Sequence, residues 1–387
     1  MVAPAVMKFQ MLILFIMLML PVLKFYDAKK SFRAKINNNK WKNCHMHPYK
    51  ESTNGNEKII LIYDTLYGSF DSWKHWWGSD EDQFCSEPNV NIVYHCHIYI
   101  GKHYLLEKAE LVIFSWFQWD RMPSSPIPPK RDGQLWALVT QDSPFDRWNL
   151  NMPIDWVMTY ESKADIKVES GVVARRGKDT GTLPSYKLSK ARKFGAIFIN
   201  KCDAISKRDD LIRDLQNQNL IIDVYGNCGN MVLNSSSLRA YKYLSRRYKF
   251  FFALEDAICR DYVTIKFYYA LMFPWIPIVL GGGKYSSVAP PKSYVSVMDF
   301  LSIQSLTKYL KHLDGNETAY LEYFYWKSEY DVKIKMYQGC KACIHLHKYL
   351  EHRGRVPNLA EFSQERQCFT PNSTNDLFSA KYFLKKI

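Results

Sequence analysis

From residue 58 onward, short apolar runs of strand length alternate with longer polar or mixed stretches. Such bounded apolar runs are typical of buried strands. A first set lies at 59–63, 90–94, 111–114 and 135–139. A second set lies at 194–199, 220–224, 249–254 and 276–280, with helical patterns at 206–218 and near 261–272. Because strands that alternate with helices favour parallel sheets, we predict an α/β protein with two Rossmann-like domains facing a cleft.

The segments around these runs set the predicted domain boundaries. Residues 172–193 are basic and contain glycine, which favours a hinge, whereas 302–337 have a helical pattern and the chain after 355 is expected to be irregular. The predicted parts are a tail at 1–8, an anchor at 9–23, a stem at 24–57, an N-terminal domain at 58–185, a C-terminal domain at 186–355 and a C-terminal tail at 356–387.

The run FQMLILFIMLMLPVL at 9–23 is the segment apolar enough to enter a bilayer. We interpret it as an uncleaved transmembrane signal-anchor rather than a cleaved signal peptide, because no small-x-small site follows it. The basic residues downstream of the run would by themselves keep the body of the protein in the cytosol. Three N-x-S/T sequons, at Asn234, Asn316 and Asn372, instead favour a lumenal body that carries N-glycans.

The chain has nine cysteines, including a C-x-x-C at Cys340 and Cys343 and a wider pair at Cys85 and Cys96. We favour long-range disulfides between the two pairs, which imply an oxidising compartment. A zinc site helped by the neighbouring histidines is the alternative, although the Cys85/Cys96 spacing is wide for one. A thioredoxin-like redox motif is a second alternative, for which the context of Cys340 is a loose match.

The 387 residues carry a formal net charge of +14, which raises the possibility of a nucleic-acid-binding protein. Most of this excess lies in residues 1–57 and 341–387, rather than on one folded face as nucleic-acid binding requires. Within the remainder, a basic belt occupies 175–213. This distribution favours a small anionic ligand over a polymer, and we predict no nucleic-acid partner.

Candidate chemistry concentrates in residues 249–300. A strand ends at Glu255 and Asp256, and a helix is expected to start near Asp261 with Lys266 in its first turns. A helix N-terminus beside a lysine suits a diphosphate, and Glu255 could accept hydrogen bonds from sugar hydroxyls. The alternative is that Asp261 only caps the helix and Lys266 is solvated. The triple glycine at 281–283 is interpreted as a tight turn.

This stretch resembles the signature of the α-1,3/4-fucosyltransferases, glycosyltransferase family 10, and in particular invertebrate-type α-(1,3)-fucosyltransferases. The similarity extends from about residue 58 to about residue 347. The ordered matches include Glu255, Cys259, Asp261, Tyr262, Val263, Thr264, Lys266, Pro277, Gly281, Tyr285, Ala289, Pro290, Pro291, Ser293, Asp299 and Phe300, with Gly133-Gln134-Leu135-Trp136, Asp142-Ser143-Pro144 and Met158-Thr159-Tyr160 upstream.

The resemblance implies a GT-B arrangement, in which the C-terminal domain binds GDP-fucose and the N-terminal domain helps to bind a glycan acceptor. It also implies a single-pass type II Golgi membrane protein with a lumenal catalytic body. Fucose would be transferred with inversion to an N-acetylglucosamine hydroxyl of a glycoprotein or glycolipid glycan. Asp142 takes the position of the catalytic base. No metal is required, although manganese stimulates some members. The GDP-fucose contacts implied by position are Asn200, Arg208, Glu255, Tyr262 and Lys266.

Several positions depart from the family pattern. Asp142 replaces a glutamate, Asp256 an asparagine, Glu161 an arginine, Ile265 a glutamate and Tyr269 an asparagine. Buried polar partners left without a bond cost about 1–3 kcal/mol each. A degenerate relative with weak or no transferase activity, acting as a glycan-binding or partner protein, is therefore the alternative. The acceptor, either an N-glycan core or a Lewis-type antenna, and the oligomeric state stay open.

Overall fold

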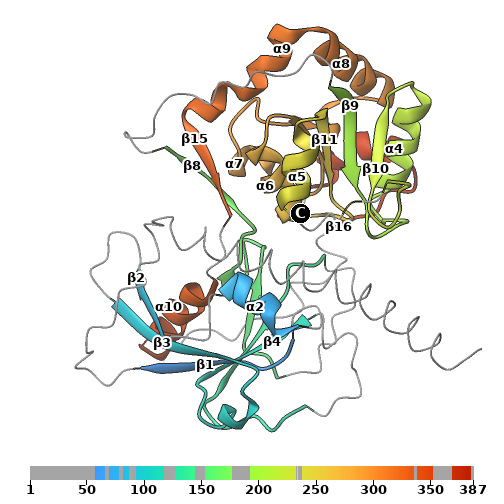
Figure 1. The fold of residues 1–387 in the computed structure, drawn as a ribbon. Helices are drawn as coiled ribbons and strands as arrows, with labels where there is room; N and C mark the ends of the chain where they lie inside the picture. The colour runs from blue at the N-terminus through green and yellow to red at the C-terminus, as the bar shows by residue number, and fades with distance from the viewer. Residues whose placement is uncertain are drawn as a thin grey trace, which may run out of the picture. The chain divides into compact units, whose positions relative to one another are not determined.

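The structure is a computed structural model (Figure 1). It describes residues 57–65, 69–77, 82–86, 93–116, 127–143, 153–176, 192–231, 233, 238–334, 338–351 and 368–384. Within these ranges no helix is long and apolar enough to cross a membrane. The predicted anchor at 9–23 and stem at 24–57 lie outside the described residues, apart from Glu57.

The N-terminal half contains a parallel sheet in which neighbouring strands follow the order β3-β1-β4-β5-β6-β7. The strands β4 and β5 are buried along their whole length, as their continuous apolar runs predict. The bounds in this half are β1 (Lys58–Ile62), α2 (Phe70–Trp77), β2 (Asp82–Ser86), β3 (Val93–Ile100), η1 (His103–Leu105), β4 (Leu111–Ser115), β5 (Leu135–Val139), β6 (Trp156–Thr159), β7 (Ile166–Lys167) and β8 (Val172–Arg175).

The C-terminal half contains a second parallel sheet, of order β10-β9-β11-β13-β14. Its bounds are β9 (Lys193–Phe198), α4 (Arg208–Asn217), β10 (Ile222–Tyr225), α5 (Leu238–Ser245), β11 (Tyr248–Leu254), β12 (Ile258–Cys259), α6 (Ile265–Met272), β13 (Ile276–Leu280), α7 (Tyr285–Val288), β14 (Val295–Ser296), η2 (Val297–Asp299), α8 (Ile303–Gly315), α9 (Glu317–Leu321) and η3 (Glu322–Ser328).

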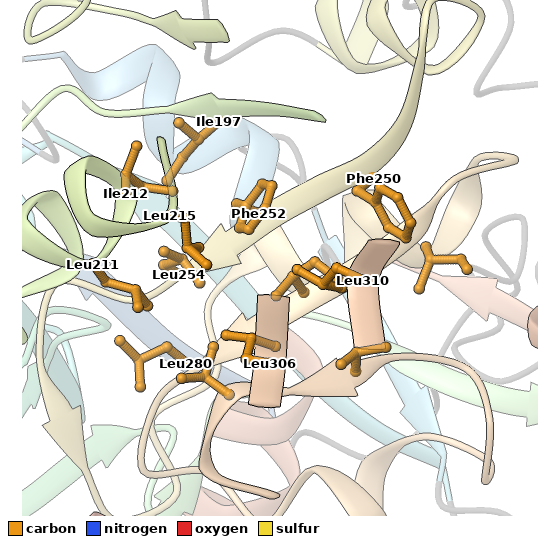
Figure 2. Packing of buried hydrophobic residues seen from close by; sticks show 14 of the residues in the cluster. Ile197, Leu211, Ile212, Leu215, Phe250, Phe252, Leu254, Leu280, Leu306 and Leu310 are labelled. Atoms are coloured by element: carbon orange, nitrogen blue, oxygen red, sulfur yellow. The ribbon is translucent and has the colours of Figure 1, made fainter. Parts of the chain in front are cut away.

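Helices bury both faces of this second sheet. On one face, α4 and α8 pack against β11, and Figure 2 shows Leu211 and Leu215 of α4 in one cluster with Phe252 of the strand and Leu306 of α8. On the other face, α5 and α6 pack against the alternate side chains of β11, such as Phe251. The α/β prediction with parallel sheets is therefore confirmed.

Two local predictions differ from the structure. The segment 302–337 is not helical throughout, because Tyr330–Lys333 forms β15, which pairs antiparallel with β8 inside the predicted hinge. Local pattern does not reveal a pair so distant in sequence. The helix expected near 261–272 begins at Ile265, because Asp261 has a left-handed backbone (φ 60°) and Thr264 is extended and serves as the N-cap. Asp261 is therefore not the cap.

The C-terminal part of the chain is also arranged differently from the expectation. Helix α10 (Gln338–Glu351), grouped by the sequence with the C-terminal domain, contacts α2, β1 and β7 of the N-terminal half. Residues 368–384, expected to be irregular, form β16 (Cys368–Phe369), η6 (Thr374–Phe378) and α11 (Ala380–Leu384). β16 pairs with β12, and Leu377 and Phe378 join the C-terminal core. Apolar side chains in this short segment therefore complete a core that lies far away in sequence.

The predicted presence of disulfides is confirmed. Cys96 is bonded to Cys343, and Cys85 and Cys340 are also disulfide-bonded. Because the sulfurs of Cys96 and Cys343 are bonded to each other, they do not act as thiolate ligands beside His347. The sequence did not predict the bonds Cys202–Cys228 and Cys259–Cys368.

Candidate active site

The candidate site lies at the carboxyl ends of β9 and β11, which are neighbours in the C-terminal sheet. The strand order reverses here, since β10 lies beyond β9 on one side and β13 beyond β11 on the other. Ligands of open α/β sheets bind at such a reversal. Asn200 and Lys201 follow β9, and Glu255 and Asp256 follow β11.

Glu255 fixes the start of helix α6. Its carboxylate is fully buried and accepts hydrogen bonds from the backbone N–H of Thr264 at 2.8 Å and from the Thr264 hydroxyl at 2.9 and 3.0 Å. The Nζ of Lys266 lies 3.2 Å from Oε2 of Glu255. In the described structure this carboxylate holds the helix N-terminus and Lys266. Its contact with the sugar of a nucleotide donor stays a prediction.

Asp256 lies next to Glu255 but has a different environment. The Tyr262 hydroxyl donates to its Oδ1 at 3.0 Å, and the Nζ of Lys201 lies 3.8 Å from Oδ2. Burial would by itself raise the pKa of Asp256, but the charges of the three nearby cations and the Tyr262 hydrogen bond lower it below its ordinary value. Asp256 is therefore an ionised carboxylate surrounded by positive charge. The cations are Lys266, Arg208 and Lys201.

Arg208 is at the site but is almost completely buried. Its two terminal nitrogens donate to the carbonyl oxygens of Leu254, at 3.2 Å, and Lys201, at 2.8 Å, and Nε lies 4.0 Å from the Asp209 carboxylate. In the described structure the guanidinium thus links the end of β11 to the loop after β9. Its pairing with a diphosphate stays a prediction, and its charge acts on Asp256 within the site.

The loops after β9 and β10 are joined covalently by the bond between Cys202 and Cys228. The backbone N–H of Asn227 also donates to Oδ1 of Asn200 at 3.3 Å. Gly226 has φ +93°, and a Cβ there would approach Oδ1 of Asn200 to 2.4 Å. Asn200, predicted to contact the donor, is therefore held between these two loops.

The triple glycine follows β13 and is required by close packing. A Cβ on Gly282 would lie 1.9 Å from the carbonyl oxygen of Cys259. A Cβ on Gly281 would lie 2.6 Å from the Tyr285 hydroxyl and 2.9 Å from Cγ of Glu255. Because glycine has no Cβ, the backbone after β13 can lie against the segment that carries Tyr262. The glycines therefore serve close packing as well as the predicted tight turn.

Asp142, the predicted base, follows β5 and is partly buried, and its backbone N–H donates to the Thr140 hydroxyl at 3.1 Å. The rings of Tyr160, at the end of β6, and Tyr262 have centroids 5.0 Å apart. Burial raises the pKa of both tyrosines, and the negative charges of Asp142 and Asp256 raise them further. Asp142 therefore acts electrostatically on the same tyrosine pair as Asp256.

Sequence reasoning missed two parts of this arrangement. Lys201 was counted in the basic belt but not assigned to the site, although its place directly after a buried strand was a usable signal. The bond between Cys202 and Cys228 was also missed, although both cysteines follow predicted strands.

Comparisons with known proteins cover both halves of the chain. A family model described as "Fucosyltransferase, N-terminal" matches residues 30–171, and one described as "Glycosyltransferase family 10 (fucosyltransferase) C-term" matches residues 188–362. The chain belongs to glycosyltransferase family 10. The family's C-terminal model includes every residue of the candidate site that follows β9 and β11, from Asn200 to Lys266.

Relatives named as α-1,3-fucosyltransferases in two animals match this chain over different lengths. "Alpha-(1,3)-fucosyltransferase C" of Drosophila melanogaster is 27% identical over 343 residues, which span 81% of this chain and 78% of that protein. "Alpha-(1,3)-fucosyltransferase fut-1" of Caenorhabditis elegans is 35% identical over 159 residues, 41% of this chain and 36% of that protein. A crystal structure of an alpha1,3-fucosyltransferase with GDP-fucose has a TM-score of 0.50 at 16% identity, covering 81% of this chain and 96% of that one. It supports the α/β fold.

Proposed function

We propose that this chain is a GDP-fucose-dependent α-1,3-fucosyltransferase that transfers fucose with inversion to an N-acetylglucosamine hydroxyl. The observation that supports this most is the group of Lys201, Arg208 and Lys266 around the carboxyl ends of β9 and β11, in a chain of family 10. Positive charge at this position suits the diphosphate of a nucleotide sugar. The relatives named as α-1,3-fucosyltransferases support the same reaction.

In the proposed reaction, the Asp142 carboxylate removes the proton of the acceptor hydroxyl. The hydroxyl oxygen forms a bond to C1 of fucose from the face opposite the leaving group. The bond from C1 to the β-phosphate oxygen breaks, and its electron pair stays on GDP. The proton remains on Asp142 until solvent removes it, and Lys266 and Lys201 stabilise the charge that develops on the departing diphosphate.

The remaining sequence predictions are part of this proposal. The two Rossmann-like domains would form a GT-B cleft, with an N-terminal acceptor domain at 58–185 and a GDP-fucose-binding domain at 186–355. Residues 9–23 would anchor a type II protein in the Golgi membrane with its body in the lumen. Asn316 and Asn372 are exposed and could accept N-glycans, whereas Asn234 lies outside the described residues. Manganese would be a stimulant rather than a requirement.

The test is a transferase assay on the purified 387-residue chain. GDP-fucose is offered with N-acetyllactosamine acceptors and with N-glycan cores, and both GDP release and fucosylated product are measured. Product formation supports the proposal and identifies the acceptor class. GDP-fucose binding without turnover would instead favour a degenerate, glycan-binding relative, and absence of donor binding would overturn both the enzyme and its donor site. Parallel assays with manganese and with a chelator measure the effect of the metal.

The base assignment has its own test. Asp142→Asn keeps the size of the side chain but cannot accept the proton, so we expect turnover to fall by at least about 100-fold. GDP affinity, measured by calorimetry, should stay within about twofold, since Asp142 lies on the acceptor half of the chain. Equal losses of turnover and GDP affinity would contradict the role of Asp142 as the base.

A further inference from the structure

The two carboxylates at the end of β11 differ in their exposure to solvent and in their contacts within the protein. Glu255 has no exposed surface and is held by Thr264 and Lys266. The Asp256 side chain keeps 18% of its surface exposed, and it contacts the Tyr262 hydroxyl and, at a longer distance, Lys201. The side chain of Lys201 is itself 57% exposed. Asp256 therefore presents negative charge to the solvent side of a cationic site.

Position 256 holds an aspartate where the family pattern given above has an asparagine. An asparagine would accept the Tyr262 hydrogen bond equally well, because its Oδ1 is also an acceptor. The hydrogen bond therefore does not explain why a carboxylate stands at this position. What distinguishes aspartate from asparagine here is one negative charge close to the cations that would hold a diphosphate.

Such a charge does not act equally on the donor and on the product. The diphosphate of a nucleotide sugar is esterified at both ends and carries two negative charges. The terminal phosphate of a free nucleoside diphosphate is a monoester whose second pKa is about 6, so near neutral pH it carries about one more charge. A fixed carboxylate beside the phosphates therefore repels the product more strongly than the donor.

We propose that Asp256 is a specificity-determining residue that weakens the binding of the nucleoside diphosphate product more than that of the nucleotide sugar, and so promotes product release. This inference rests on the proposed function, because it requires the site after β9 and β11 to hold the diphosphate. Asp256 would then have a function of its own, although it departs from the family motif.

The experiment compares dissociation constants for GDP and GDP-fucose, measured by calorimetry without acceptor, on the 387-residue chain and on Asp256→Asn. We expect the substitution to tighten GDP binding about tenfold and GDP-fucose binding about threefold or less. The matched control is Asp314→Asn, which removes the same charge at the amino end of β11, where Oδ1 of Asp314 accepts from Lys249 Nζ at 2.6 Å. The control should leave the ratio of the two dissociation constants unchanged.

The pH dependence separates repulsion from a merely structural role. At about pH 5.5 the terminal phosphate of GDP gains a proton, whereas the lowered pKa of Asp256 keeps its carboxylate ionised. The substitution should then tighten GDP and GDP-fucose binding by similar factors. The described groups that act on Asp256 or on the tyrosine pair Tyr160 and Tyr262 are Lys201, Arg208, Lys266, Glu255, Asp142, Glu161 and Asp261.

The outcomes are distinguishable. Equal tightening of GDP and GDP-fucose at both pH values, or weaker binding of GDP by Asp256→Asn, would overturn the role of Asp256 and leave the proposed function standing. If the unsubstituted chain binds neither nucleotide, the proposed function itself fails. Faster unfolding of the variant alone would not produce a difference between two ligands, so the ratio remains informative if Asp256→Asn is less stable.

Discussion

The carboxyl ends of β1 and β11 are each followed by a partly buried aspartate, and the pKa values of the two shift in opposite directions. Asp64 follows β1, where the strand order of the N-terminal sheet reverses, and its Oδ1 accepts from the backbone N–H of Ser115 at 2.7 Å. Burial raises the pKa of Asp64 well above its ordinary value. Asp256 is also partly buried, but the cations around it lower its pKa.

The two strand ends differ in the charge and in the covalent links that surround them. The strand order reverses in both sheets, and at the C-terminal reversal the structure shows three cations and a disulfide between two loops. At the end of β1 the described contacts are hydrogen bonds to uncharged groups, including Trp73 Nε1 to the Asp64 carbonyl at 2.7 Å and His103 Nε2 with the Tyr63 carbonyl at 2.6 Å. The position within the sheet therefore does not by itself determine the charge around a strand end.

The largest expected effect comes from removing the covalent link at the C-terminal strand ends. In the double variant Cys202→Ser, Cys228→Ser, the loop closed over a sequence separation of 26 residues is released. A loop of this size predicts a loss of about 3 kcal/mol in the free energy of unfolding. Denaturant titration gives this loss, and calorimetry should show weaker GDP binding. An unchanged transition midpoint would mean that hydrogen bonds alone hold these loops, as they do after β1.

A smaller effect is expected from removing the cation beside Glu255. Lys266→Met leaves that buried carboxylate with Thr264 but without its ion pair, so we expect a loss of about 2 kcal/mol in stability and weaker donor binding. Lys266→Arg is the matched control, since it keeps the charge. If Lys266→Met were as stable as the control, the hydrogen bonds from Thr264 would be enough to stabilise the Glu255 carboxylate. The difference in charge between the ends of β1 and β11 would then depend on Asp256 and its cations.

The smallest effect concerns the pH dependence of stability at Asp64. Because the folded-state pKa of Asp64 is raised, the folded protein binds its proton more tightly than the unfolded chain does. The contribution of Asp64 to stability is therefore greatest below the unfolded pKa, near 4. It is lost as pH rises through the folded-state pKa. Asp64→Asn still accepts from Ser115 and removes this loss. The variant should gain up to about 1 kcal/mol relative to the unsubstituted chain between pH 4 and pH 7.

Urea titrations at several pH values between these limits measure the Asp64 effect. Asp256 predicts the reverse sign, because its folded-state pKa is lowered: its contribution is present above the unfolded pKa and is lost as pH falls through the folded value. A stability difference for Asp64→Asn that grows as pH falls would show that Asp64 is ionised in the fold and would remove the contrast between the two strand ends.

Sequence reasoning located β1, β4 and β5 of the first sheet and β9, β10, β11 and β13 of the second, because a buried parallel strand is a continuous apolar run. It overlapped β3 only at its start and did not predict β6, β7 or β14. It also identified the residues directly after β11, since strand ends in such sheets are where ligands bind. It did not predict the hydrogen-bond and ion-pair partners of these side chains. Asp261 has a left-handed backbone and helix α6 begins only at Ile265, so the N-terminus of the helix lies beside the Glu255 carboxylate. Local propensity does not specify that conformation.

The other differences share a physical cause, which is pairing between distant segments. The pairs β8 with β15 and β12 with β16 join residues more than a hundred positions apart. Neither member has a strong pattern of its own, and each becomes a strand because its partner supplies hydrogen bonds. The same reason explains why Cys368 appeared to lie in an irregular tail, although it is bonded to Cys259.

The bond between Cys96 and Cys343 has a consequence for a cleaved form of this protein. It spans a sequence separation of 247 residues and encloses the C-terminal sheet from β9 to β14. A protease that cuts the chain once between these cysteines would leave two fragments joined by sulfur. The nicked protein would therefore migrate as one species on a gel until the disulfide is reduced.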